Sequence, residues 1–207
     1  MNNTHLKGLY IISDDSLSGA SLLDHVQQAL AGGARLVQYR NKGDSNVVRE
    51  HTARALLEIC REQRVPLLIN DDVELARKIG ADGVHLGQSD TRLVEARQQL
   101  GTGAIIGVTC HASIELAAQA QENGASYVAF GRFFPSKTKP DAPPANPELL
   151  ADAKQQLSIP ICAIGGITPN NATPLIDAGA DLIAVIHGVF GQPDIEKAAK
   201  CYKNLFA

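Results

Sequence analysis

We predict a single-domain α/β fold, a (β/α)8 TIM barrel covering residues 1–207, from three features of the sequence. Eight short apolar runs of strand length alternate with amphipathic stretches of helical length. A Gly-Ala pair precedes every second apolar run, at intervals of roughly 45–55 residues, which is the length of two strand-helix units. The 207 residues are near the lower limit of this fold, for which about 200 suffice. Such alternation favours parallel strands with right-handed crossovers, and the repeats favour closure of the sheet.

The strands and helix ends can be placed in order along the chain. The predicted strands are Leu9–Ser13, Leu36–Arg40, Leu67–Asn70, Val84–Leu86, Ile105–Cys110, Tyr127–Phe130, Pro160–Gly165 and Leu182–Ile186. The pairs that precede every second strand are Gly33-Ala34, Gly80-Ala81, Gly124-Ala125 and Gly179-Ala180. Each of these glycines follows a helical stretch, where a left-handed residue is favoured just past the helix C-terminus.

An open doubly wound sheet is the main alternative architecture. That fold needs a glycine fingerprint after its first strand, at the start of a helix. The nearest candidate, Gly101-x-Gly103-x-x-x-Gly107, precedes a strand instead of following one. We therefore interpret these glycines as a helix-to-strand turn, and the closed barrel is the better prediction.

Composition argues against several classes of function. The net charge is −3, no basic stripe is present, and there are five Phe, four Tyr and no Trp, so a nucleic-acid partner is not expected. No apolar run approaches the ~20 residues of a membrane span, and the first residues show no signal pattern. Cys60, Cys110, Cys162 and Cys201 form no C-x-x-C pair and are predicted to be buried free thiols. We expect a cytoplasmic protein. The sequence leaves the oligomeric state open, and a homo-oligomer is one of the alternatives.

Two carboxylates stand just past neighbouring strands. Asp71 follows Leu67–Asn70, and Asp90 follows Val84–Leu86 at the end of Gly87-Gln88-Ser89-Asp90. The carboxyl ends of parallel strands meet at one rim of a barrel, which is where the chemistry of this fold is found. Mg²⁺ often takes one or two carboxylates together with substrate phosphates. The sequence therefore predicts that these aspartates share one Mg²⁺ ion and that a phosphate faces them.

The second strand ends in side chains that suit an anion. Gln38, Arg40 and Lys42 alternate along the chain and are expected to face the barrel mouth together. Polar groups in such a place are costly without a partner, and a bound anion would satisfy two of them. The alternative is a solvated loop with local salt bridges.

The fourth to sixth strands add imidazoles, hydroxyls and cations. His85 lies within an apolar strand and is expected to be a hydrogen-bonded interior residue, whereas Thr109 and His111 reach the rim after the fifth strand. The sixth strand leads into Ser136-Lys137-Thr138-Lys139, where two hydroxyls and two ammonium groups suit a phosphate. Lysine serves such sites as a flexible point charge.

The last two strand ends suggest a second anion site. Gly165-Gly166 allows close backbone approach, and Thr168-Pro169 predicts an N-cap and a first helical residue. Backbone amides at such a helix start favour an anion, as does the eighth-strand end at Ile186-His187. An ordinary tight turn is the alternative.

Together these motifs resemble the thiamine-phosphate synthase family, whose members join the pyrimidine and thiazole halves of thiamine. The resemblance covers essentially the whole chain. Its motifs are Gln38-x-Arg40-x-Lys42, Asn70-Asp71, His85-Leu86-Gly87-Gln88-x-Asp90, Ser136-x-Thr138-Lys139 and Ala163-Ile164-Gly165-Gly166-Ile167-Thr168-Pro169.

The resemblance implies two small-molecule substrates and a role for each matched residue. The pyrimidine diphosphate would contact Gln38, Arg40, Lys42, Asn70, Thr109 and Lys139, of which Arg40, Lys42, Thr109 and Lys139 would be catalytic. Asp71 and Asp90 would hold Mg²⁺ on its diphosphate. The thiazole phosphate would lie on Ser136, Thr138 and Gly166, with the backbone near Ile186 and His187. Family members commonly carry Ser in place of His187, so here only the backbone contact is expected.

The implied reaction displaces diphosphate from the pyrimidine methylene with the thiazole nitrogen as nucleophile. Three other functions are weighed against it. A thiazole tautomerase of the same barrel family would have no reason to keep Lys42, Asp90 and Lys139 together. A non-catalytic phosphate-binding barrel would not need the whole set of charged residues, and a sugar-phosphate epimerase would need metal-binding histidines or an acid/base pair of carboxylates.

Replacing Lys139 tests the role that the resemblance implies for it. Lys139→Ala is expected to slow coupling much more than it weakens binding of thiazole phosphate, because its ammonium group would act on the departing diphosphate. Turnover rates at saturation and the dissociation constant of thiazole phosphate check this. Lost binding with unchanged turnover at saturation would contradict the assignment.

Overall fold

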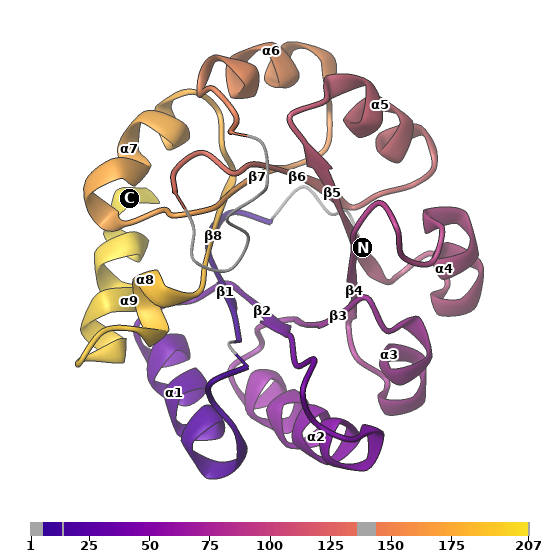
Figure 1. Ribbon diagram of the computed structural model, residues 1–207, viewed down its shortest axis with the longest axis vertical. Coiled ribbons are helices and arrows are strands. Elements are labelled where there is room, and N and C mark those ends of the chain that lie inside the picture. Colours follow the sequence, from indigo (N-terminus) through magenta and orange to yellow (C-terminus); the bar gives the residue numbers. More distant parts are fainter. Residues whose placement is uncertain (1–5, 14, 136–143, 207) are drawn as a thin grey trace.

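The computed structural model describes residues 6–13, 15–135 and 144–206, and these form a closed parallel barrel (Figure 1). Its strands pair in the order of the sequence, and the last pairs with the first. They are β1 (Gly8–Ile12), β2 (Leu36–Tyr39), β3 (Leu67–Asn70), β4 (Gly83–Leu86), β5 (Ile105–His111), β6 (Tyr127–Phe130), β7 (Ile161–Ile164) and β8 (Leu182–Val185). The predicted TIM barrel is confirmed, with strand ends within one or two residues of those expected.

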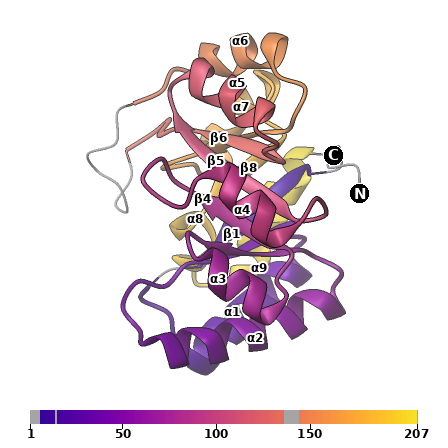
Figure 2. The same ribbon diagram turned by 90° about the vertical axis from the view of Figure 1, so that its right-hand side faces the viewer.

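The helices form an outer ring around the strands (Figure 1). They are α1 (Gly19–Ala31), α2 (Asn46–Glu62), α3 (Val73–Ile79), α4 (Leu93–Leu100), α5 (Ile114–Glu122), α6 (Glu148–Gln156) and α7 (Pro169–Asp177), followed by α8 (His187–Phe190), α9 (Ile195–Lys203) and the 3-10 turn η2 (Asn204–Phe206). Seen from the side, η2 lies at the end of the barrel where β1 begins (Figure 2). No helix among the described residues is long and apolar enough to cross a membrane.

Glycines end the helices as the sequence predicts. Gly33, Gly80, Gly124 and Gly179 all have positive φ, between 68° and 112°, just past α1, α3, α5 and α7. Gly101 likewise ends α4, with φ of 80°. This confirms the helix-to-strand turn, except that Gly107 lies within β5.

The buried side chains form two layers. Alternate strand residues point outward and pack with the helices in a large apolar cluster that includes Ile11, Val37 and Ile69. The inward residues form a smaller cluster inside the barrel, made of Tyr10, Leu36, Leu68, Tyr127, Ala129, Cys162, Leu182 and Ala184. The barrel is therefore filled below its rim, and ligand space is restricted to the carboxyl ends of the strands.

Three of the four cysteines are buried free thiols, as predicted. Burial raises the pKa of the Cys60 and Cys110 thiols to about 12. For Cys201 the prediction was wrong, because this thiol is exposed. Ala199 and Tyr202 occupy the inward side of α9, which turns Cys201 to the surface.

Gly107 makes room for a buried ring. A Cβ atom added to Gly107 would lie 2.0 Å from Cζ of Tyr127, which is fully buried inside the barrel. The two residues are register partners on adjacent strands, so neither can move far without disturbing the ladder. A glycine at this point of β5 is therefore required by the size of its neighbour.

Gly107→Ala is expected to lower the free energy of unfolding by about 1–3 kcal/mol, the usual cost of overpacking a core. Urea unfolding measures this. The matched control is Gly103→Ala, since nothing lies within 4 Å of a Cβ at that exposed position. Equal stability of the two variants would contradict the steric role of Gly107.

Candidate active site

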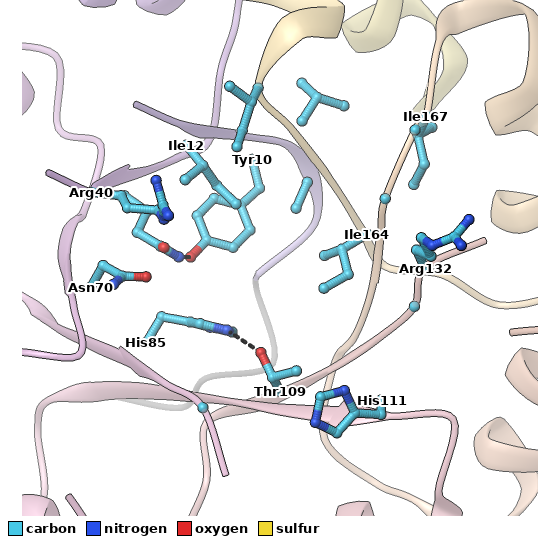
Figure 3. Close-up of a pocket in the computed structure, with 18 of the residues that line it drawn as sticks. Tyr10, Ile12, Arg40, Asn70, His85, Thr109, His111, Arg132, Ile164 and Ile167 are labelled. Atoms are coloured by element: carbon cyan, nitrogen blue, oxygen red, sulfur yellow. Dashed lines mark hydrogen bonds between the residues drawn. The ribbon is translucent and has the colours of Figure 1, made fainter. Parts of the chain in front are cut away.

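A pocket of about 680 Å³ opens at the carboxyl ends of the strands. Figure 3 shows Arg40, Asn70 and His85 on one side of it, and Ile164, Ile167 and Arg132 on the other. The predicted site residues that line the pocket are Gln38, Arg40, Lys42, Asn70, Asp71, Asp90, Thr109, Gly166, Ile186 and His187. Ser136, Thr138 and Lys139 lie outside the described residues, so their assignments stay predictions.

Asp71 and Asp90 come together at the ends of β3 and β4. Asp71 has a φ of 62°, and its Oδ2 accepts a hydrogen bond of 2.6 Å from Asn70 Nδ2. Asp90 Oδ2 accepts from the Gly87 amide, also at 2.6 Å, which closes the loop after β4. Burial, and then the neighbouring carboxylate of Asp90, raise the pKa of Asp71. Two negative charges are therefore held close together in a partly buried place.

This carboxylate pair fits a hard divalent cation. The opposing ammonium of Lys42 is 3.5 Å from Asp71 Oδ2 but largely exposed, and it only partly offsets the effect of Asp90. Within the described ranges, no cluster of three or more His, Cys, Asp or Glu side chains could hold a metal. A metal on Asp71 and Asp90 would thus take its remaining ligands from water or substrate, as Mg²⁺ commonly does.

Arg40 is held by a carboxylate that the sequence analysis missed. Asp15, just after β1, accepts 2.6 Å from Arg40 Nη1 and 2.9 Å from the Lys42 amide. Ser13 Oγ also bonds both the amide and the carbonyl of Arg40, at 2.7 and 2.9 Å. Local salt bridges therefore exist, as the alternative reading held, yet Arg40 and Lys42 still line the pocket. The sequence did hold a signal for Asp15, because this residue is a carboxylate just past the first predicted strand.

Glycines pack the β7 loop against the β6 loop. A Cβ on Gly165 would lie 2.3 Å from the Arg132 Cβ, and one on Gly166 would lie 2.3 Å from the carbonyl oxygen of Pro135. The Phe134 amide donates 3.1 Å to the Gly165 carbonyl, which extends the ladder past the strands. The close approach to the backbone of Gly165 and Gly166 that the sequence predicts is therefore made by the loop after β6 of the same chain. It brings Arg132, also missed from sequence, to the pocket wall.

The predicted start of α7 is confirmed. Thr168 is the N-cap of α7 and Pro169 its first residue, and the Thr168 amide donates 2.8 Å to Asn171 Oδ1. After β8, Ile186 precedes the short helix α8, which begins at His187. Ile186 and His187 both line the pocket. Residues of two loops thus line the side of the pocket away from Asp71.

A β-bulge ends β5. The register with β6 shifts between Thr109 and His111, which pair with Ala129 and Phe130. His111 has a φ of 52° and lines the pocket. The extra residue, Cys110, is buried on the outer side, so that Thr109 faces the interior. Bulges of this kind occur beside active sites, where they change the direction of a side chain.

The raised pKa of Asp71 can be tested by titration. Asp90→Asn is expected to lower it, because the neighbouring charge is lost while an oxygen remains for the Gly87 amide. Lys42→Gln is expected to raise the pKa of Asp71 further, because the neighbouring positive charge is lost.

In the parent chain the folded state binds the Asp71 proton more tightly than the unfolded state does. The free energy of unfolding therefore decreases as the pH rises from the ordinary pKa through the raised one. Carboxyl NMR titrations and urea unfolding against pH measure both effects. Identical titration of Asp71 in all three proteins would refute the pairing.

Comparison with known proteins identifies the family of this chain. Residues 9–189 match the family model TMP-TENI, described as thiamine monophosphate synthase. A thiamine-phosphate synthase of Marinobacter nauticus is 59% identical over 97% of this chain and 91% of its own length, and one of Saccharophagus degradans is 50% identical over 95% and 92%. The solved thiamine phosphate pyrophosphorylase from Pyrococcus furiosus is 32% identical, with a TM-score of 0.88 over 99% of this chain and 96% of that one. The chain belongs to the thiamine monophosphate synthase family.

Proposed function

We propose that this protein is a thiamine-phosphate synthase, a transferase that joins an aminopyrimidine methyl diphosphate to thiazole phosphate. The products are thiamine phosphate and diphosphate. The observation that carries the proposal is the division of the pocket rim. Paired carboxylates and two cations lie on the β2–β4 side, and glycines and other residues of the loops after β7 and β8 lie on the opposite side. Two phosphate-bearing substrates would meet across such a pocket.

The chemistry requires charge stabilisation and positioning. The thiazole ring nitrogen attacks the pyrimidine methylene carbon, forming a C–N bond as the C–O bond to diphosphate breaks. Diphosphate departs with the electron pair of the broken bond. The nucleophile is a neutral nitrogen with no proton to lose, so no general base is needed. Preorganised cations and substrate positioning are the principal contributions expected of the protein.

Arg40, Lys42 and Lys139 are proposed to stabilise the departing diphosphate. Arg40 is preorganised for this by Asp15, which fixes its guanidinium at the pocket. Lys42 is less enclosed, since its side chain is 60% exposed against 18% for Arg40. Bound at Asp71 and Asp90, Mg²⁺ would supply further neutralisation of the diphosphate charge.

The remaining predicted residues are proposed to hold the two substrates. Gln38, Asn70 and Thr109 line the side of the pocket proposed for the pyrimidine diphosphate. The thiazole phosphate is assigned to Gly166, the backbone at Ile186 and His187, and the hydroxyls of Ser136 and Thr138. A tautomerase would use only the second set, and it is not favoured by the named relatives.

The cellular setting is also a proposal. Buried free thiols at Cys60, Cys110 and Cys162 are consistent with the reducing environment of the cytoplasm.

The direct test mixes the purified protein with both substrates and Mg²⁺ and measures thiamine phosphate and diphosphate. Asp71→Asn and Asp90→Asn are each expected to abolish turnover, at least a hundredfold, and to keep the fold. Asp82→Asn is the matched control, since Asp82 accepts from the Leu67 amide at the amino end of β3, outside the pocket. It should retain activity.

Undiminished activity in both pocket variants with Mg²⁺ chelated would refute the metal assignment. An inert parent chain with both substrates and Mg²⁺ would refute the proposed function itself. Circular dichroism of each variant separates loss of chemistry from loss of fold.

A further inference from the structure

A chain of hydrogen bonds crosses the floor of the pocket. Gln38 Nε2 donates to the Tyr10 hydroxyl, and the Tyr10 and Tyr127 hydroxyl oxygens are 2.9 Å apart. Tyr127 Oη is 2.7 Å from His85 Nδ1, and His85 Nε2 is 2.8 Å from Thr109 Oγ1. All five side chains are buried, and they come from β2, β1, β6, β4 and β5. The two end members, Gln38 and Thr109, both line the pocket.

The orientation of the Gln38 amide sets the direction of the hydrogens in this chain. An amide nitrogen only donates, so the Tyr10 oxygen accepts from Gln38. Within the described part of the chain, the only other partner of the Tyr10 hydroxyl is Tyr127, to which it must donate its single hydrogen. Tyr127 then donates to His85 Nδ1, which leaves the ring hydrogen on Nε2, directed to Thr109. Burial raises the pKa of both phenols, so each keeps its hydrogen.

We propose that Tyr10 and Tyr127 are positioning residues that fix the hydrogen-bonding polarity of the pocket floor. Gln38 is held with its carbonyl oxygen available to a ligand as an acceptor. Thr109, already accepting from His85, keeps its own hydrogen as a donor. The inference rests on the proposed function and narrows it to one feature of the pyrimidine.

The ligand that fits this polarity carries a donor beside an acceptor on a flat apolar ring. Ile12 and Ile164 line the same pocket and provide an apolar wall near Tyr10 (Figure 3). An aminopyrimidine presents an exocyclic amino group toward the Gln38 oxygen and a ring nitrogen toward the Thr109 hydroxyl. An oxopyrimidine reverses both groups. Its exocyclic oxygen would face the Gln38 oxygen, and its ring N–H could pair with Thr109 only if the Thr109 hydrogen turned away. A site built to pair specific polar groups rejects the mismatched analogue strongly.

Reversal of the network is opposed by its length. To accept the oxo analogue, Gln38 would have to turn its amide, both phenols would have to rotate, and His85 would have to move its hydrogen to Nδ1. Because the four bonds share members, none of these changes can occur alone without leaving a buried group unsatisfied. The phenols therefore connect the orientation of Gln38 to the tautomer of His85.

The tautomer of His85 tests the direction of the chain without any substitution at the phenols. In the full chain labelled with ¹⁵N-histidine, long-range ¹H–¹⁵N spectra distinguish the two ring nitrogens, and the signal lost in His85→Gln identifies the residue. We expect hydrogen on Nε2 and an acceptor Nδ1. Hydrogen on Nδ1 would overturn the proposal.

Discrimination between aminopyrimidine and oxopyrimidine diphosphates tests the role of the phenols. In Tyr127→Phe and Tyr10→Phe, the amino-to-oxo ratio of kcat/KM is expected to fall at least tenfold, with the KM for thiazole phosphate within twofold of the parent. Tyr39→Phe is the matched control, a buried phenol on the outer side of β2 next to Gln38. It should keep the parent ratio. An unchanged ratio in both network variants, or an equal rise of both KM values, would overturn the proposal.

Two further measurements distinguish a failure of this inference from a failure of the proposed function or of folding. If the parent chain forms no thiamine phosphate, the proposed function fails, while calorimetric binding of the unphosphorylated amino and oxo pyrimidines still compares the same variants. If Tyr127→Phe does not fold, Tyr10→Phe and the His85 tautomer still decide the matter.

Discussion

The ladder between β1 and β8 is the contact on which the arrangement of the molecule depends. Gly8 to Ile11 pair in register with Leu182 to Val185, and this joins the two ends of what would otherwise be an open sheet. Closure leaves no strand edge exposed and brings every carboxyl end to one ring. Arg40 and His187 are distant in sequence, yet they line one pocket for this reason. The site is thus a result of closure, not of local sequence.

Closure also decides what lies inside the barrel. Leu36, Leu68 and Leu182 fill the interior together with the rings of Tyr10 and Tyr127. The two phenol hydroxyls are paired in the chain of hydrogen bonds from Gln38 to Thr109. An unsatisfied buried polar group costs about 1–3 kcal/mol, so these hydroxyls are tolerated in an apolar interior because each of them has partners there.

Sequence patterns were sufficient for the fold and for most of the rim, because both follow from spacing along one strand. Asp71, Asp90, Arg40 and Lys42 could be found as charges just past apolar runs. Asp15 carried the same signal, a charge just past an apolar run, and was missed. Arg132 and the two phenols could not be found, since their roles come from partners on other strands. The bulge at Cys110 and the exposure of Cys201 depend on register and on helix rotation, which a single strand or helix pattern does not specify. Charge at strand ends was therefore predictable, and the contacts that orient it were not.

Tyr127 can take its place in the chain of hydrogen bonds only because Gly107, its register partner on β5, has no side chain. Substitutions at these two positions should therefore be tolerated only as compensating pairs, with any gain in volume at residue 107 matched by a loss at residue 127. A smaller residue at 127 would also remove the hydroxyl that Tyr10 and His85 share. Under the proposed function, recognition of the pyrimidine is consequently tied to the backbone spacing between β5 and β6. Redesign of the proposed pyrimidine site would then have to begin with Gly107, which does not line the pocket.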